Sequence, residues 1–242
     1  MTINDIIKQE QESINLFFNT EKIIVPPLPE WITEKHVERW QSLFFDLHFL
    51  PRVEMKEDLN LEKWKDRPEK VFYDKVEDRK ITAAAVFLPG KWVLVDSRNK
   101  PERKRLWINK NEAKLLRIFG VDFKKSEKQQ YDNDYLKEIL HNEGFGSRFC
   151  LNINDIDKLK PFAADILQVK NGIVRLPRFI EWNYMANAFY PQWATTKTWE
   201  WFEDKYGNDC HLAGGHLSSG VIGWDPENYW STILGFRFIV EM

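Results

Sequence analysis

Residues 175–186 read RLPRFIEWNYMA, and this stretch decides how the C-terminal half of the chain is organised. The short stretch IVR at 173–175 leads into Pro177, whose missing N–H suits the first turn of a helix. Apolar side chains then recur at helical spacing on one face. The pattern predicts a short strand followed by a helix, with Glu181 and Trp182 on opposite faces of its first turn.

The rest of the chain is predicted to contain both helices and short strands. We predict an N-terminal helix capped by Asn4 or Asp5, and a helix over 152–167 that is capped by Asn154 or Asp155 and kinked or restarted at Pro161. The predicted helices are 4–20, 33–47, 71–81 and 152–167, and the clearest strands are 91–97 and 235–242. Residues 51–70 are predicted to form a covering loop or a long tie, and residues 111–143 helical pieces and exposed loops. This mixture of helices and short strands is predicted to belong to the α+β class.

Two short patterns suggest contacts that hold the fold. In Trp199–Glu200–Trp201 the alternation places both indoles on one side of a strand and Glu200 on the other. Near the end of the chain, Arg237 is predicted to pair with a buried carboxylate, either Glu181 or Glu200.

Composition excludes several classes of function. The chain has 242 residues, of which 43% are hydrophobic and 30% charged, as in soluble globular proteins. A net charge of −2 argues against a nucleic-acid binder, which needs a basic surface. No apolar stretch approaches the length of a membrane span, so we expect no membrane insertion. Because no signal peptide is evident, we expect a cytoplasmic chain as synthesised, with virion association or surface display left open.

The stretch HLAGGHLSSGVIGW at 211–224 holds four of the 11 glycines and suggests a site of chemistry. Zinc bound by Cys210, His211 and His216 is disfavoured, because neighbouring residues rarely share a tetrahedral ion and no fourth ligand is evident. Phosphate-loop and Ser–His–Asp patterns are absent. WDPEN at 224–228 is interpreted as a turn rather than a calcium site. We therefore expect no metal and no cofactor, and we interpret Cys150 and Cys210 as reduced packing residues.

Five motifs in order carry a family resemblance. They are LNINDIDKL (151–159), RLPRFIEWNYMA (175–186), TWEWFED (198–204), LAGGHL (212–217) and LGFRFIV (234–240). The series resembles the formylglycine-generating-enzyme branch of the C-type lectin fold. That resemblance implies short twisted antiparallel strands with flanking helices and an N-terminal helical extension. It implies an N-terminal segment, 1–65, packed on a lectin-like domain, 66–242.

The resemblance does not extend to the catalytic residues of the family. The copper-binding oxidases have a cysteine pair shortly after the Gly-Gly motif, and this chain has no cysteine after Cys210. The related iron oxidases use three histidines at a spacing that is absent here. The chain is therefore predicted not to be an enzyme.

The predicted function is non-catalytic ligand or receptor binding. Proteins diversified by retroelements keep a similar scaffold and vary the segment between Gly-Gly and Gly-Phe-Arg, which is 214–237 here. A partner protein or surface ligand is expected to contact ten residues: His216, Leu217, Ser218, Ser219, Val221, Trp224, Asp225, Tyr229, Trp230 and Thr232. Of these, His216, Ser218 and Ser219 are expected to be exposed. The alternatives are a metal-dependent oxidase and a structural protein of a virion or other assembly.

Overall fold

The computed structural model describes residues 2–98, 136, 140, 148–169, 172–231 and 233–242. The helices are α1 (Ile3–Phe18), α2 (Glu34–Ser42), α3 (Lys70–Glu77), α6 (Ile153–Leu167) and α7 (Phe179–Ala188), with 3₁₀ turns η1 (Ala83–Val86) and η3 (Pro191–Thr195). The strands are β1 (Phe45–Leu50), β2 (Lys91–Asp96), β3 (Ile173–Arg175), β4 (Trp199–Tyr206), β5 (Cys210–Gly214), β6 (Ile222–Pro226), β7 (Leu234–Gly235) and β8 (Ile239–Glu241). The fold is α+β, as predicted. The prediction for 111–143 lies outside the described residues, apart from 136 and 140.

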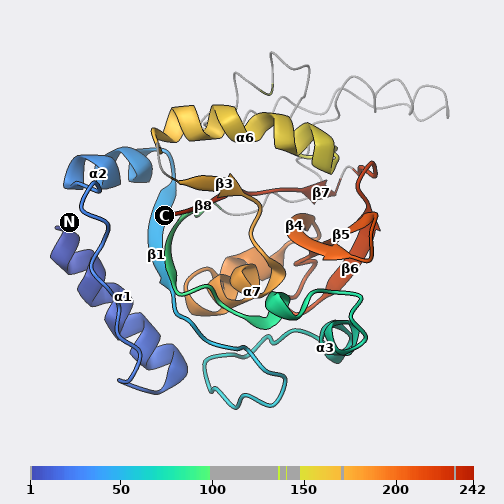
Figure 1. Cartoon of the computed structure of the whole chain (residues 1–242), viewed down its shortest axis with the longest axis horizontal. Coiled ribbons are helices and arrows are strands. Elements are labelled where there is room, and N and C mark those ends of the chain that lie inside the picture. The colour runs from blue at the N-terminus through green and yellow to red at the C-terminus, as the bar shows by residue number, and fades with distance from the viewer. Residues whose placement is uncertain (1, 99–135, 137–139, 141–147, 170–171, 232) are drawn as a thin grey trace.

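The strands form two four-stranded sheets. One has the order β1-β2-β8-β3, and all its pairs are antiparallel. The other has the order β6-β5-β4-β7, in which β7 runs parallel to β4. The C-terminal strand β8 therefore lies inside the first sheet, between β2 and β3, and β3 lies beside it in Figure 1.

Two helices cover the sheets from different sides. In Figure 1, α6 lies above β3 and β8, whereas α7 lies below them. The apolar face of α6 packs against Trp201, Ala213 and Phe238 in one core cluster. The buried side chains of α7 belong to a larger cluster that also includes residues of α1, α2 and β1. The two helices thus belong to two different core clusters, and the N-terminal elements share the larger one.

Local signals predicted most helices, although the caps differ. In α1, Thr2 is the N-cap, and it forms a reciprocal capping box with Asp5. Asn152 caps α6 by accepting from the Asp155 N–H at 3.0 Å. The expected caps at Asn4 or Asp5, and at Asn154 or Asp155, are therefore wrong by two or more positions. α6 is one continuous helix that contains Pro161.

The helix predicted over 33–47 is wrong in its second half. α2 ends at Ser42, Phe44 has a positive φ of 63°, and residues 45–50 form strand β1. A short apolar run cannot be assigned to helix or strand by its periodicity alone. Here pairing with β2 along the whole of β1 decides in favour of the strand.

A buried polar cluster attaches α1 to the sheet. His48 Nδ1 lies 2.9 Å from Glu10 Oε1, and His48 Nε2 lies 2.6 Å from the Tyr190 hydroxyl. That hydroxyl donates to Asp46 Oδ2 at 3.0 Å, and Glu10 Oε2 accepts the backbone N–H of Phe49 at 3.0 Å. The cluster connects α1, β1 and the segment after α7, so it fixes where the N-terminal helix packs.

Arg237 pairs with Glu200, one of the two carboxylates predicted for it. The two guanidinium–carboxylate distances are both 2.7 Å, and the guanidinium carbon lies 3.6 Å from the centre of the Trp193 ring. Glu200 also accepts from the indole of Trp182 at 2.6 Å. Glu181 binds other arginines instead. These contacts join β4, α7 and the chain terminus behind the predicted binding segment.

Candidate ligand-binding site

The predicted segment begins with a loop, 215–221, that connects β5 to β6. The Asp66 carboxylate accepts from the Ser218 hydroxyl at 2.8 Å and the Ser219 hydroxyl at 2.9 Å, and it also accepts the Ser219 N–H. Ser218 Oγ in turn accepts the Gly220 N–H at 3.0 Å. A single carboxylate from the connection between β1 and α3 therefore holds the loop.

Two asparagines of α7 form hydrogen bonds to Asp66 and Ser219 and so hold the same loop. Asn183 Nδ2 donates to the Ser219 carbonyl at 2.7 Å and to the Asp66 carbonyl at 2.9 Å. Its Oδ1 accepts from the Trp64 indole at 2.7 Å. Asn187 donates to Ser219 Oγ at 3.1 Å. Ser219 is therefore buried, with 1% of its surface exposed, and the expectation that it is exposed is wrong. Its hydroxyl is hydrogen-bonded to Asp66 and Asn187 within the protein.

The glycines of this stretch serve the backbone. A Cβ at Gly220 would lie 2.0 Å from the Arg67 carbonyl oxygen, and one at Gly214 would lie 2.6 Å from the Val221 carbonyl oxygen. Gly215 has a φ of 84°, which side chains rarely adopt. These positions allow the loop to lie against the 64–68 segment, and they contribute no chemistry of their own.

Leu217 is the exposed residue of the loop, whereas His216 and Ser218, which were expected to be exposed, are partly buried. The His216 ring stacks on the Trp199 indole, with centroids 5.3 Å apart and planes 19° apart. Leu217 is 52% exposed and has a positive φ, and its N–H donates to the Thr196 carbonyl at 3.0 Å. Val221 is partly buried. The loop thus presents an imidazole and an apolar side chain on a fixed backbone.

Strand β6 separates the next two predicted residues. Trp224 pairs with Leu212 and Asp225 pairs with His211, so their side chains point to opposite faces of the sheet. Trp224 is 38% exposed and stacks on Tyr206, with centroids 4.3 Å apart and planes 13° apart. Asp225 lies on the face of Gly223, where an added Cβ would touch the Trp199 ring at 3.5 Å. The predicted surface therefore wraps around an edge strand.

A pocket of about 280 Å³ opens on this edge. Its lining residues are Trp199, Gly223, Trp224, Asp225, Tyr229, Ser231, Ile233 and Leu234. Three of the predicted residues are among them. Trp199 was expected only to hold the fold, yet its indole joins this pocket to the His216 ring.

The remaining predicted residues follow a turn at the end of β6. WDPEN was interpreted as a turn, but Trp224–Pro226 belong to β6 and the turn begins only after them, where the Tyr229 N–H donates to the Pro226 carbonyl at 2.8 Å. Tyr229 is 43% exposed, whereas Trp230 is partly buried against Phe149 and Cys150. Thr232 lies outside the described residues. Tyr229 thus faces solvent at the pocket, and Trp230 anchors the segment.

Two carboxylates lie at or near the pocket, and only that of Glu227 has an ion-pair partner in the described structure. Glu227 lies 2.9 Å from Lys205 Nζ and 3.4 Å from His211 Nε2, and the hydrogen bond from Lys205 holds the pKa of Glu227 below its ordinary value. Asp225 has no hydrogen bond or ion pair within the described residues, and partial burial raises its pKa. The carboxylate of Asp225 is therefore the acidic group of the pocket without a partner in the described structure.

The histidines and cysteines of the stretch do not form a metal-ligand cluster. His211 Nδ1 lies 3.0 Å from the Phe202 carbonyl oxygen, and His216 stacks on Trp199. Cys150 is buried and Cys210 is partly buried. Across the described residues, no group of three or more His, Cys, Asp or Glu side chains could hold a metal ion.

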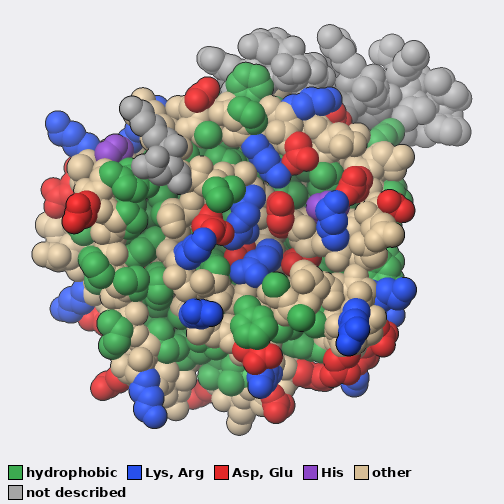
Figure 2. All heavy atoms as spheres, in the orientation of Figure 1, with side chains coloured by type: hydrophobic (Ala, Val, Ile, Leu, Met, Phe, Trp, Pro, Cys, Tyr) green, Lys and Arg blue, Asp and Glu red, His purple; other side chains and the backbone are tan. Residues whose placement is uncertain are grey.

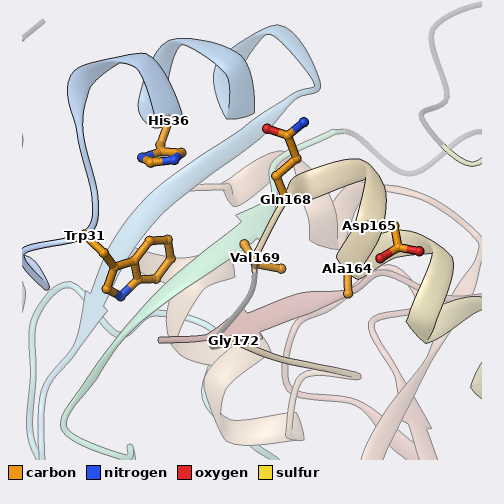
Figure 3. Close-up of a pocket in the computed structure, with 7 residues that line it drawn as sticks. All are labelled: Trp31, His36, Ala164, Asp165, Gln168, Val169 and Gly172. Carbon is orange, nitrogen blue, oxygen red and sulfur yellow. The ribbon is translucent and has the colours of Figure 1, made fainter.

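A second cavity lies between α2 and the end of α6. It measures about 840 Å³ and is lined by Trp31, His36, Ala164, Asp165, Gln168, Val169 and Gly172 (Figure 3). His36 accepts the Thr33 N–H at 3.1 Å, and its ring stacks on Trp40. None of the ten predicted contact residues lines this cavity, and its imidazole already caps α2.

The surface carries mixed charge. In Figure 2, basic and acidic side chains are interspersed over the face shown, with hydrophobic side chains between them. Within the described ranges, no helix is both long and apolar enough to cross a membrane.

Comparisons with known proteins found no match. Neither the family models nor the curated proteins nor the solved structures contain one that matches this chain.

Proposed function

We propose that the protein is a non-catalytic binding protein that presents residues 214–237 to a partner protein or surface ligand. The observation that carries the proposal is the pocket beside β6, because exposed aromatic side chains surround it. Rigid aromatic side chains provide large contact area at low entropic cost and are frequent binding hot spots. Tyr229 and Trp224 are 43% and 38% exposed there, and Leu217 is 52% exposed on the neighbouring loop.

The hydrogen bonds that hold the 215–221 loop favour a role in binding. Ser219 is held by Asp66, Asn183 and Asn187, so the loop backbone is organised before any partner arrives. A preorganised surface loses less conformational entropy on association. The motif order further supports a C-type lectin scaffold of the formylglycine-enzyme branch, and by that resemblance a retroelement-diversified binding segment.

A display experiment tests the proposal. Peptides selected from a random phage-displayed library on the wild-type protein should bind at least about tenfold more weakly to Trp224→Ala and Tyr229→Ala. Phe162→Ala is the matched control, since Phe162 is 41% exposed on α6. Selected peptides that lose affinity for the control, or that bind all variants equally, would refute the proposal.

Three further observations separate the alternatives. If residues 224–230 instead hold an assembly together, the alanine variants will unfold or dissociate rather than lose peptide binding in a folded state. A reverse-transcriptase gene beside a near-copy of the 3′ coding region would support the diversified-protein origin. Stoichiometric copper or iron in the purified protein would favour the oxidase alternative.

A further inference from the structure

The pocket beside β6 combines an unpaired carboxylate with aromatic side chains. Asp225 and Gly223 lie on the same face of β6, and the Trp199 ring lies close to Gly223. Tyr229 lines the pocket from the turn after β6. A carboxylate next to π-faces provides two independent attractions for a positive charge.

Among the described residues, no lysine, arginine or histidine forms an ion pair with the Asp225 carboxylate. Its cross-strand neighbour His211 is engaged with the Phe202 carbonyl and Glu227, and Lys205 is paired with Glu227. On the aromatic side, His216 is stacked on Trp199. Because burial is the cause that raises the pKa of Asp225, the ionised carboxylate loses hydration without gaining a partner in the described structure. A bound cation would offset that cost.

The size of the pocket restricts the occupant. At about 280 Å³ it lies just below the range of roughly 300–1,000 Å³ typical of pockets that enclose drug-sized ligands. One extended side chain matches this volume better than a cofactor does. Anionic ligands are disfavoured, because they would be repelled by Asp225.

We propose that the pocket formed by Trp199, Gly223, Asp225 and Tyr229 binds the cationic side chain of a lysine or arginine on the surface of a partner protein. The inference rests on the proposed function and names the chemical group that this surface recognises. The charged head lies against the Asp225 carboxylate, and the alkyl stem lies against the indole of Trp199.

Capped amino acids provide the probes. Nα-acetyl-arginine and Nα-acetyl-lysine methylamides are titrated while the Trp199 indole N–H resonance is followed by NMR, with Trp199→Phe identifying that resonance. The neutral analogues with citrulline and norleucine side chains are the comparison. We expect saturable shifts with a cationic probe and roughly tenfold weaker binding of its neutral analogue. Equal binding of the neutral analogues, or saturation by neither cation, would overturn the inference.

Variants test the carboxylate and the pocket separately. Asp225→Asn should weaken cation binding about tenfold, whereas Asp209→Asn, which removes an exposed carboxylate from the nearby β4–β5 turn, should not. Gly223→Ala adds one carbon at ordinary contact with Trp199, and Gly223→Val adds two more methyl groups that should block the probe. Retained binding in both Asp225→Asn and Gly223→Val would overturn the inference.

The pH dependence gives a second readout. Because the pKa of Asp225 is raised, its negative charge is gained at a higher pH than that of an ordinary aspartate. Cation binding should therefore strengthen as the pH rises from 4 to 7, and Asp225→Asn should lose this carboxylate-dependent increase. An unchanged pH profile in that variant would contradict the role of Asp225.

The outcomes distinguish this inference from the broader function. Library peptides that require Trp224 and Tyr229, but neither Asp225 nor a basic residue of their own, would support binding and overturn only the cation pocket. Peptides that bind independently of all these residues would overturn both.

Discussion

Asp66 controls the shape of the 215–221 loop, and its removal should destabilise the protein measurably. In Asp66→Ala, the buried Ser219 N–H loses its acceptor, while Ser219 Oγ keeps the Asp66 carbonyl at 3.0 Å. Ser218 is half-buried, so its hydroxyl can bind water instead. Leaving one buried donor unsatisfied costs about 1–3 kcal/mol, and the lost bonds to a charged acceptor add to this. We expect about 2–4 kcal/mol lower free energy of unfolding.

Urea denaturation measures this loss as a lower midpoint at an unchanged m-value. Asp66→Asn keeps one acceptor oxygen for Ser219 and should lose only about 1 kcal/mol. Asp58→Ala is the control, because Asp58 is an exposed aspartate on the same connection, and its effect should stay within about 0.5 kcal/mol. Hydrogen exchange should also show that protection of the Ser219 amide falls in Asp66→Ala.

Equal stability of Asp66→Ala and Asp58→Ala would refute this reasoning. It would mean that water replaces the carboxylate at no cost and that the loop is organised by its other contacts. A normal midpoint combined with unchanged protection at Ser219 would lead to the same conclusion. The argument for a preorganised binding surface would then lose its main support.

Two other substitutions test buried charges. Arg237→Met leaves the carboxylate of Glu200 buried without its arginine partner, so it should lower the free energy of unfolding in denaturant by about 3–5 kcal/mol. The double variant Arg237→Met/Glu200→Gln should recover part of this loss. Full stability of the single variant would contradict the pairing. Burial raises the pKa of Asp204 to about 7, so the folded state holds the proton of this carboxyl more tightly than the unfolded state does. The protonated carboxyl therefore contributes its full stabilisation below about pH 4, and this stabilisation is lost as the pH rises to about 7. Asp204→Asn keeps an acceptor for the Phe179 N–H and should therefore gain stability relative to wild type over that interval, by up to about 4 kcal/mol, in unfolding curves measured at several pH values. A difference in stability between Asp204→Asn and wild type that does not change with pH would contradict the raised pKa of Asp204.

Helices and their order followed from local patterns in the sequence. Apolar periodicity located α1, α3, α6 and α7, and the alternation around Glu200 placed this carboxylate opposite Trp201. These features depend on neighbours within a few residues, so they are visible without any knowledge of the fold. Strand β1 was missed because its six residues are determined by pairing with β2 rather than by their own periodicity.

The binding surface depended on contacts between distant residues. The sequence predicted Trp224, Asp225 and Tyr229, which line the pocket, but it did not indicate the role of Trp199 there. Nor did any local pattern connect Asp66 with Ser219, which lies 153 positions away.

Local spacing thus predicted most of the helices and which side chains of a strand share a face, whereas strand β1 depended on its pairing with β2. The tertiary structure alone decided that Ser219 is buried and that Asp225 lies in the pocket without a described partner. The physical reason is that burial and hydrogen bonding depend on which segments meet in space. A hydroxyl or carboxylate has the same local sequence pattern whether it ends beside a distant donor or in an open pocket.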